Sequence, residues 1–258
     1  MIDIHCHLLP ATDDGPKSFE VAVEMCHMAN VDGVTHLVAT PHCNYQYSFR
    51  RQDNQAKLAR LQAEVGASPR LLLGCDFHLS YENIRQLIDN REQFTINGSN
   101  YLLVEFDEHF VPEQMDQVFY ELQVAGLTPI LTHPERNAVC CRRSEVLYNW
   151  VTKGCLVQVT AQSYTGAFGP APQRFAEEWL ERNWIHFFAS DAHDTQHRPP
   201  LLSPCYQKVA TRHGIAVADR LLKTNAEAVL KGLPLAPGPP PVGPGTVKKK
   251  RSWFSFLR

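Results

Sequence analysis

The sequence predicts an α/β fold, a barrel of about seven β/α units, and three observations favour it. Short apolar runs recur along the chain, amphipathic helical patterns lie between them, and the alternation continues over more than 200 of the 258 residues. With 44% apolar and 20% charged residues, the chain can bury a large core. We therefore expect one globular domain followed by a tail.

The apolar runs are expected to be buried parallel strands, because each is too short for a core helix and is closed by a polar residue or a turn. They lie at 2–4, 36–39, 71–74, 101–104, 129–131, 156–159 and 185–189. Helical spacing marks three of the segments between them, around 22–29 and over 51–66 and 112–126. The last two end on a glycine, which suits a helix C-terminus.

Histidine, aspartate or glutamate follows six of the seven predicted strands. These residues are His5 and His7, His42, Asp76, Glu105, His133, and Asp191 with His193. Strand carboxyl ends meet on one face of a parallel barrel, so we expect these side chains to converge. Strands that merely ended at the surface would carry Ser, Lys, Thr and Asn as often. A set rich in imidazole and carboxylate predicts a metal site, and donors without thiolate suit two or three Mn²⁺, Fe²⁺ or Zn²⁺ ions.

Composition excludes several other classes of function. The formal net charge is −2 and no basic stripe is interleaved with aromatic residues, so we expect no nucleic-acid partner. The eight cysteines form no C-x-x-C pair, which is typical of reduced thiols in a cytoplasmic protein. No apolar run approaches the ~18–20 residues that span a bilayer.

Four short motifs carry a resemblance to a known family. The segments "DIHCH", "TPH", "THPER" and "SDAH" occur in this order, and the chain thereby resembles the polymerase and histidinol phosphatase (PHP) superfamily. Within it, "IDIHCHLLPATDDGPKS" and the later "ASDAH" and "RPP" resemble the manganese-dependent tyrosine-protein phosphatases of capsule and exopolysaccharide operons (CpsB/YwqE type). The resemblance implies a distorted TIM-like (β/α)7 barrel of the PHP type, a metallophosphatase domain over residues 1–231.

The resemblance also implies three metal sites. The first ion would bind His5, His7, Asp76 and Asp191, the second would share Asp76 and add Glu105 and His133, and the third would bind Asp14, His42 and His193. The implied metal is Mn²⁺, with Fe²⁺, Zn²⁺ or Mg²⁺ as alternatives. Family members usually carry glutamate at position 76, so the shorter Asp76 loosens the expected bridge, and His78 is a candidate to supplement it. The other histidines match no motif and are expected to be structural or solvated: His27, His36, His109, His186, His197 and His213.

The activity that the resemblance implies is hydrolysis of phosphotyrosine on a protein, a membrane tyrosine autokinase that controls exopolysaccharide or capsule synthesis. Arg136 in "HPER" and Arg198 in "HRPP" are expected to bind the phosphate, because a guanidinium fork matches phosphate oxygens. His193 is expected to assist departure of the phenol. No cysteine is followed by the C-x-x-x-x-x-R spacing, which disfavours a cysteine-dependent phosphatase.

Two alternatives remain open from the sequence. The same site fits a small phosphomonoester such as histidinol phosphate. The second alternative is a catalytically weak regulatory module. In that module Asp76 has broken the metal bridge, and the fold binds a phosphorylated tail. An amidohydrolase-like site is disfavoured, because no lysine stands at a strand end to form a bridging carbamate.

The C-terminal region predicts a linker and a tail. Residues 232–245 contain six prolines and four glycines, so 232–247 is expected to be a linker without helix or strand. Residues 248–258 combine five basic residues with Trp253, Phe254 and Phe256, a pattern typical of peripheral membrane contact. The alternative is a disordered tail that binds nothing or binds a partner protein. With the contact, the protein would act in the cytoplasm at the inner face of the membrane.

Overall fold

The strands form the framework of the molecule. The structure is a computed structural model, and it describes residues 1–79, 84, 87 and 90–245. Within these residues the strands are β1 (Ile2–Cys6), β2 (His36–Ala39), β3 (His42–Cys43), β4 (Arg70–Leu73), β5 (Asp76–His78), β6 (Tyr101–Glu105), β7 (Thr128–Thr132), β8 (Leu156–Thr160) and β9 (Phe187–Ala189). All seven predicted runs therefore contain a strand, and β3 and β5 are additional.

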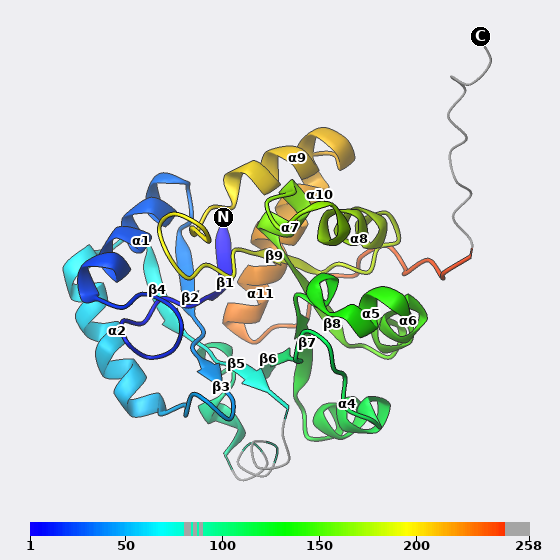
Figure 1. The fold of residues 1–258 in the computed structure, drawn as a ribbon, viewed down its shortest axis with the longest axis horizontal. Helices are drawn as coiled ribbons and strands as arrows, with labels where there is room; N and C mark the ends of the chain where they lie inside the picture. Colours follow the sequence, from blue (N-terminus) through cyan, green and yellow to red (C-terminus); the bar gives the residue numbers. More distant parts are fainter. Residues whose placement is uncertain (80–83, 85–86, 88–89, 246–258) are drawn as a thin grey trace.

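The strands pair in parallel around a ring (Figure 1). One sheet has the order β1-β2-β4 and the other the order β3-β5-β6-β7-β8-β9. Strands β2 and β3 are two pieces of one path interrupted at Pro41, and β4 and β5 are two pieces interrupted at Gly74. A bridge between Cys6 and Ala192 joins β1 to the segment after β9 and closes the ring. This arrangement confirms the predicted distorted seven-unit barrel.

Backbone hydrogen bonds continue across the two interruptions. The amide of Gly74 donates to the carbonyl of Ala39 at 2.8 Å, and the amide of Asp76 donates to the carbonyl of Pro41 at 3.2 Å. Proline has no amide hydrogen, so the regular ladder cannot pass through position 41. The barrel wall is therefore bent at these points without leaving an open edge.

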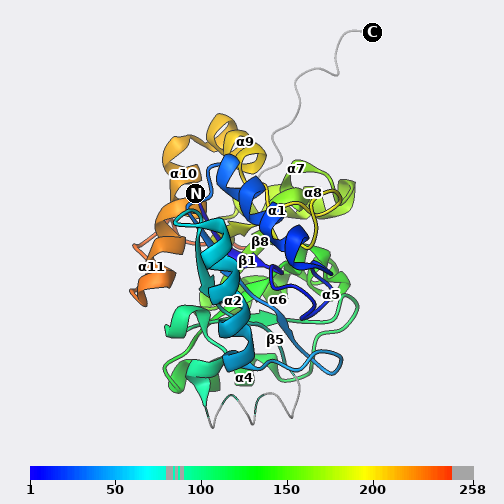
Figure 2. The ribbon, with the colours of Figure 1, turned by 90° about the vertical axis from the view of Figure 1, so that its left-hand side faces the viewer.

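Helices cover the outside of the ring (Figure 2). Those described are α1 (Phe19–Val31), α2 (Arg51–Val65), α4 (Met115–Val124), α5 (Ala138–Arg142), α6 (Ser144–Thr152), α7 (Ala161–Thr165), α8 (Pro170–Glu181), α9 (Ser203–His213), α10 (Ile215–Asp219) and α11 (Asn225–Lys231). The three predicted helices are present as α1, α2 and α4. Helix α4 begins three residues later than its predicted segment, after Gln114, which has a left-handed backbone.

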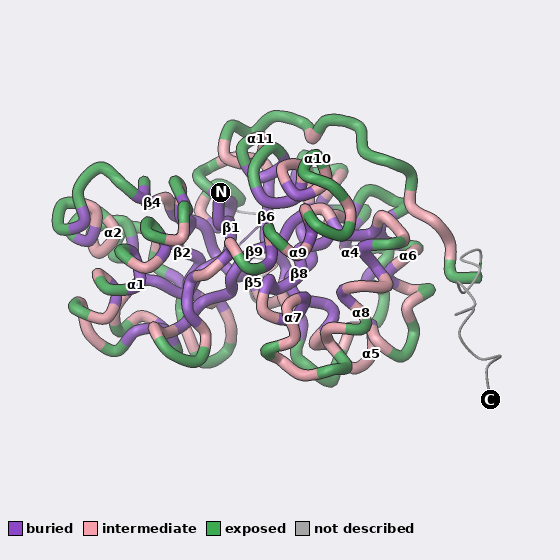
Figure 3. Tube along the Cα trace, turned by 90° about the horizontal axis from the view of Figure 1, so that it is seen from above, coloured by how far each residue is buried: buried purple, intermediate pink, exposed green. Residues whose placement is uncertain are grey.

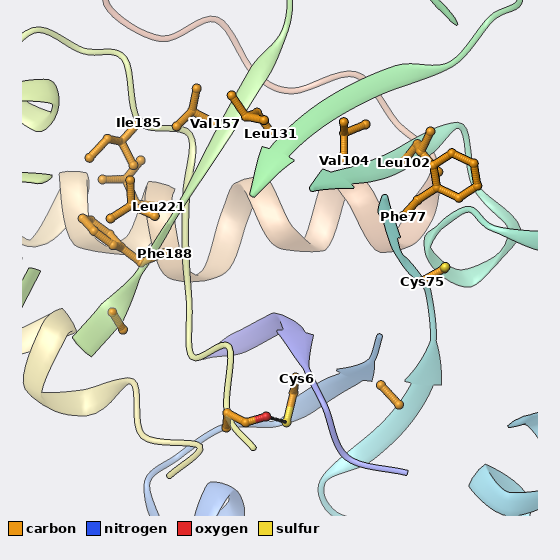
Figure 4. Packing of buried hydrophobic residues seen from close by; sticks show 14 of the residues in the cluster. Cys6, Cys75, Phe77, Leu102, Val104, Leu131, Val157, Ile185, Phe188 and Leu221 are labelled. Carbon is orange, nitrogen blue, oxygen red and sulfur yellow. Dashed lines mark hydrogen bonds between the residues drawn. The ribbon is translucent and has the colours of Figure 1, made fainter. Parts of the chain in front are cut away.

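Two apolar layers hold the barrel together. The inner layer contains Tyr101, Leu103 and Phe187 from the strands, with Val229 of α11 against them, so α11 closes the amino-terminal end of the barrel. The outer layer lies between strands and helices, and Figure 4 shows part of it. The members labelled there include Phe77, Leu102, Val104, Leu131, Val157 and Phe188. Figure 3 shows the same division, with buried positions along the strands and exposed ones on the helices.

Residues 233–245 form a strap without helix or strand, and this strap is held against the barrel. The hydroxyl of Tyr101 donates to the carbonyl of Leu233 at 2.7 Å, and the indole of Trp184 donates to the carbonyl of Val242 at 2.9 Å. The predicted basic and aromatic tail 248–258, with residues 246 and 247 before it, lies outside the described residues. None of the helices in the described part is long and apolar enough to cross a membrane.

Candidate metal centre

The predicted ligand residues converge at the carboxyl ends of the strands. They form four groups, and in each group one ligand atom from every residue lies within 4.8 Å of the others. The groups are His7, Asp14, His42 and His193; His5, His7 and Asp76; His5, His133 and Asp191; and His42, Asp76 and Glu105. All nine residues predicted to bind metal therefore take part.

Strand alternation explains the place of two carboxylates. In β6 the inward-facing residues Tyr101 and Leu103 belong to the inner apolar layer, and Glu105 is the next residue on that face. After β9 the same period of two leads from Phe187 through Ala189 to Asp191. Each of these carboxylates is thus the last in a series of inward-facing residues, at the carboxyl end of its strand.

Strand β1 needs an irregularity to bring its histidines inward. Ile2 and Ile4 belong to the inner apolar layer, so strict alternation would turn His5 outward. The pairing of β1 with β2 shifts register between Asp3 and Cys6, and this shift reverses the faces. His5 and His7 are consequently both buried in the cluster.

Two residues of the site have a left-handed backbone. His133, which follows β7, has φ of 32°, and Asp191 has φ of 51°. Such conformations are costly for residues with a side chain and persist where the surrounding structure enforces them. Here the turn after each strand aims a ligand into the mouth of the barrel.

The side chains expected to bind the first ion, His5, His7, Asp76 and Asp191, lie close to one another. Nε2 of His5 lies 3.4 Å from both Oδ2 of Asp76 and Oδ1 of Asp191. Nε2 of His7 lies 3.5 Å from the same Oδ1 of Asp191. The structure divides this expected set between two groups, one with Asp76 and one with Asp191, and His5 belongs to both.

The second set differs from the expected one, whereas the third contains Asp14, His42 and His193 as expected, with His7 in addition. Nδ1 of His42 lies 3.4 Å from Asp76 and 3.2 Å from Glu105, so His42 joins the second set, whereas His133 falls in a group with His5 and Asp191. Nε2 of His133 nevertheless lies 3.6 Å from Oε1 of Glu105. The other ring nitrogen of His42 faces Asp14 at 3.5 Å, so this one imidazole links two groups.

Two buried atoms show that the site suits a cation. Oδ2 of Asp76 and Nδ1 of His42 are both buried, and neither has a hydrogen-bond partner among the described residues. The ion-pair contacts of Oδ2 of Asp76, at 3.4 Å to His5 and His42, replace its lost hydration only in part, because no hydrogen bond is made. A divalent cation coordinated by both atoms would remove that cost, and the mixed nitrogen and oxygen donors fit Mn²⁺, Fe²⁺ or Zn²⁺.

The histidine pKa values are shifted in opposite directions within a few ångströms. Burial alone would lower the pKa of His5, but Asp76 and Asp191 raise it to about 9. Burial likewise opposes protonation of His42, yet Asp76 and Glu105 raise its pKa to about 12. Burial and then His193 lower the pKa of His7 to about 3. Protons on His5 and His42 thus occupy positions that cations would take.

A second layer of polar groups, which the sequence did not reveal, orients the ligands. Oδ2 of Asp13 lies 2.8 Å from Nδ1 of His7, and Oε1 of Gln158 lies 2.9 Å from Nδ1 of His5. Each contact leaves Nε2 of its histidine facing the cluster, which is the usual role of an outer-shell partner. Asp13 also accepts a bond from the amide of Gly15, where a Cβ atom would lie 2.7 Å from the carbonyl oxygen of His7.

Arg136 and Arg198 meet at Asp191. Both guanidinium groups donate to Oδ2 of Asp191, while its Oδ1 faces the histidines. The ring of Phe168 lies 5.1 Å from Arg136 and 5.9 Å from Arg198, measured from ring centroid to guanidinium carbon. Both arginines line a cavity of about 320 Å³ over the cluster. Its volume is near the lower limit for small-ligand pockets, so it suits one side chain of a substrate.

The remaining histidines lie outside the four groups. Nε2 of His78 is 3.7 Å from Oδ2 of Asp107 at the rim of the cavity, so His78 does not supplement Asp76 in this geometry. The six histidines expected to be structural or solvated are also absent from the groups found in the described part.

The comparison with known proteins agrees with this geometry. Residues 1–231 match the family described as "Capsular polysaccharide synthesis, CpsB/CapC". The chain belongs to this family. Tyrosine-protein phosphatase YwqE of Bacillus subtilis (strain 168) is 33% identical over 264 residues, which cover 100% of both proteins. Tyrosine-protein phosphatase CpsB of Streptococcus pneumoniae is 26% identical over 239 residues, 89% of this chain and 98% of that protein.

Two solved structures share the fold of this chain. The first comes from work on YwqE of Bacillus subtilis and CpsB of Streptococcus pneumoniae, which are described there as unique metal-dependent tyrosine phosphatases. It has a TM-score of 0.88 and 32% sequence identity, and the match covers 96% of this chain and 100% of that one. A β-aspartyl dipeptidase of Fervidobacterium islandicum AW-1 has a TM-score of 0.60 at 14% identity, covering 90% of this chain and 72% of that one. The second likeness shows the barrel fold alone.

Proposed function

We propose that this chain is a metal-dependent protein-tyrosine phosphatase, a phosphoric monoester hydrolase that acts on phosphotyrosine in capsule or exopolysaccharide synthesis. The observation that carries the proposal is one cavity lined by two arginines and by six of the nine candidate metal-binding side chains, with the other three buried in the same cluster. Membership of the CpsB/CapC family and the names of YwqE and CpsB support the same substrate class.

The proposed cofactor is Mn²⁺, two or three ions per chain, with Fe²⁺, Zn²⁺ or Mg²⁺ as alternatives. The residues proposed to hold them are His5, His7, Asp14, His42, Asp76, Glu105, His133, Asp191 and His193. Divalent cations there would stabilise negative charge on the phosphoryl group and activate water for attack. The residues of the chain supply position, charge balance and exclusion of bulk water.

Arg136 and Arg198 are proposed to bind the phosphoryl oxygens. Asp191 holds both guanidinium groups at one carboxylate oxygen, so they are already oriented before substrate arrives. Burial would disfavour the charge of Arg136, but Asp191 and then Glu135 raise its pKa above the ordinary value. Two fixed cationic forks would stabilise the charge of an in-line transfer.

His193 is proposed as a metal ligand or, through the same Nε2, as the group that assists the leaving phenol. Its Nδ1 lies 3.0 Å from the backbone carbonyl of Asp191, which fixes the ring and turns Nε2 toward Asp14 at 3.4 Å. The phenol of tyrosine has a pKa of about 10, so its departure needs less protonation than that of an alkyl alcohol. This difference favours an aryl ester as substrate.

The proposed partner is a membrane tyrosine autokinase whose phosphotyrosines are hydrolysed. The tail 248–258 would then contact anionic lipid and keep the enzyme in the cytoplasm at the inner face of the membrane, where tethering raises the effective concentration of substrate. The strap 233–245 supports this arrangement because Arg182 and Trp184 donate hydrogen bonds to the carbonyls of Gly243 and Val242, which hold the chain against the barrel as far as these residues.

A comparison of substrates tests the proposal. The full chain is loaded with Mn²⁺, its metal content is measured, and initial rates are compared on a phosphotyrosine peptide and on histidinol phosphate. We expect at least two ions per chain and a clear preference for the peptide. A preference for histidinol phosphate would overturn the substrate class. Fewer than two ions with no turnover of any aryl phosphate would indicate a regulatory binding module instead.

Substitution of the arginines tests their role. Arg136→Lys and Arg198→Lys keep a positive charge but lose the planar fork, so kcat/KM for the peptide should fall roughly 10- to 100-fold. The matched control is Arg143→Lys at an exposed position outside the cavity, which should retain the wild-type rate. Equal rates for all three variants would remove the arginines from the proposed mechanism.

A further inference from the structure

A turn with two tyrosines forms part of the wall of the metal-centre cavity. Residues 44–47 follow β3 directly, and therefore lie two residues beyond the ligand His42. All four residues of the turn line the cavity, together with the two arginines and six of the nine candidate metal ligands. Tyr45 is 92% exposed, although a large aromatic side chain usually buries most of its surface.

The turn is held in one conformation by Asn44. Its side-chain oxygen accepts hydrogen bonds from the amides of Gln46 and Tyr47, both at 2.9 Å. The amide of Asn44 in turn donates to the carbonyl of Tyr47 at 3.0 Å. A turn closed at both ends presents its side chains without a large ordering cost on binding.

The two tyrosines lie at different positions relative to the metal centre. The ring of Tyr47 is nearly parallel to the imidazole of His42, with an interplanar angle of 12° and a centroid distance of 6.1 Å. Both nitrogens of that imidazole face carboxylates of the cluster, those of Asp14 and Asp76. The imidazole of His42 therefore separates the ring of Tyr47 from these carboxylates. The ring of Tyr45 contacts no other aromatic ring in the described part of the chain.

The position of the phosphoryl group determines which part of the substrate lies beside the rings of Tyr45 and Tyr47. A phosphoryl group bound by Arg136, Arg198 and the ligand cluster occupies the floor of the cavity, so the esterified group extends toward the opening. A phenyl ring attached to the ester oxygen would fill the space beside the turn, and a short alkyl group would leave it to water. Aromatic rings favour offset or edge-to-face packing in such a space.

We propose that Tyr45 and Tyr47 form an aromatic platform that binds the ring of an aryl phosphate and so selects phosphotyrosine over phosphoserine. This inference rests on the proposed function and assigns its substrate selectivity to named side chains. The platform binds the ring equally in the ground state and the transition state, so its loss should raise KM more than it lowers kcat.

Substitution of Tyr45 tests the platform in the full, metal-loaded chain. Tyr45→Leu should lower kcat/KM for a phosphotyrosine peptide roughly three- to tenfold, mainly through KM, and Tyr45→Phe should restore it. A phosphoserine peptide of the same sequence should be affected less than twofold. The matched control is Tyr120→Leu, which removes an exposed tyrosine of α4 away from the cavity and should change neither substrate.

A binding measurement gives a readout that does not depend on turnover. Inhibition or dissociation constants are measured for phenylphosphonate and for methylphosphonate, with metal content checked in each variant. Tyr45→Leu and Tyr47→Leu should weaken phenylphosphonate roughly three- to tenfold and leave methylphosphonate unchanged. Equal weakening of both compounds, or of neither, would overturn the platform. Failure of the proposed function would appear differently, as wild-type protein that hydrolyses neither peptide.

Discussion

At the scale of single residues, Asp76 is the only carboxylate that belongs to two of the four groups found in the described part of the chain. Its Oδ2 lies 3.4 Å from Nε2 of His5 and 3.4 Å from Nδ1 of His42. Asp76→Asn removes the charge that both groups share. We expect the variant to bind fewer ions and to lose activity by more than about 100-fold, beyond the loss typical of outer-shell changes. Metal analysis and initial rates on an aryl phosphate measure both effects.

The control for Asp76 is another aspartate on the surface. Asp53 on α2 is exposed and its nearest charged partner is Arg50 at 3.9 Å, so Asp53→Asn should retain metal and activity. If Asp76→Asn kept its full metal content and its full rate of hydrolysis, the proposed role of Asp76 as a metal ligand shared by two groups would be wrong.

Asp13 is expected to act through His7 rather than on a cation. Its Oδ2 bonds Nδ1 of His7 at 2.8 Å and accepts from the amide of His42 at 3.1 Å, so one carboxylate orients two ligand residues. Asp13→Asn should weaken metal binding about 10- to 100-fold while leaving the fold intact. Titration of the metal-free protein with Mn²⁺, with circular dichroism as the folding check, measures this. Affinity within twofold of the wild type would contradict the orienting role.

The sequence predicted the members of the cluster but not their arrangement. Chain position at a strand end was sufficient to select residues such as His5 and Glu105, because every strand of a barrel ends at the same face. The pairing of His42 with Asp76 and Glu105 depends on ring orientation, which spacing does not encode. Gln158 was missed because it lies within β8 and is not a typical metal ligand.

At the scale of secondary structure, the strands were predicted better than their interruptions. Hydrophobic pattern located all seven runs, since buried parallel strands read as continuous apolar segments. The two-residue strand β3 and the three-residue strand β5 lie beyond Pro41 and Gly74 and are too short for any pattern to reveal. The register shift in β1 was also unpredictable, because it depends on the partner strand β2.

The strap 233–245 is expected to stabilise the barrel although it has no regular structure. It covers the inner layer through Leu235 and accepts hydrogen bonds from Tyr101, Asn183 and Trp184. A chain that ends at residue 232 should be less stable than one that ends at 245 by about 2–4 kcal/mol, the sum of lost apolar burial and unpaired donors. Urea unfolding of the two chains gives this difference directly.

A single substitution separates the hydrogen bonds from the packing. Trp184→Phe in the chain that ends at 245 removes the donor to Val242 and leaves space beside a fully buried ring, so it should cost more than the ~1 kcal/mol of the hydrogen bond alone. In the chain that ends at 232 the indole would lack that partner, so the same substitution should cost less there. Equal costs in both chains would show that the strap contributes nothing through Trp184.

At the scale of the whole molecule, the closed ring makes the metal centre a property of the complete fold. Its ligands extend from His5 in β1 to His193 after β9, and β1 and β9 are joined only where the barrel closes. Unfolding any part of the ring therefore separates ligands, so metal binding and folding must be coupled.

This coupling predicts opposite pH dependence with and without metal. In the metal-free protein the pKa of His5 is raised from 6.5 to about 9, so its contribution to the unfolding free energy is complete below pH 6.5 and is lost as the pH rises to about 9. The pKa of His7 is lowered to about 3, so its protonation on unfolding destabilises the fold as the pH falls below 6.5. Through these two groups, stability without metal should fall on either side of pH 6.5, by up to about 1.4 kcal/mol per pH unit for each group.

With saturating Mn²⁺ the dependence above pH 6.5 should reverse. Cations replace the protons that His5 and His42 carry in the metal-free protein, so each ion is bound in competition with protons and binds more tightly as they become scarce. Urea unfolding between pH 5 and pH 8.5, with chelator or with Mn²⁺, should show a stabilisation by metal that increases with pH. A stabilisation independent of pH would mean that the cations bind elsewhere than between these histidines and carboxylates.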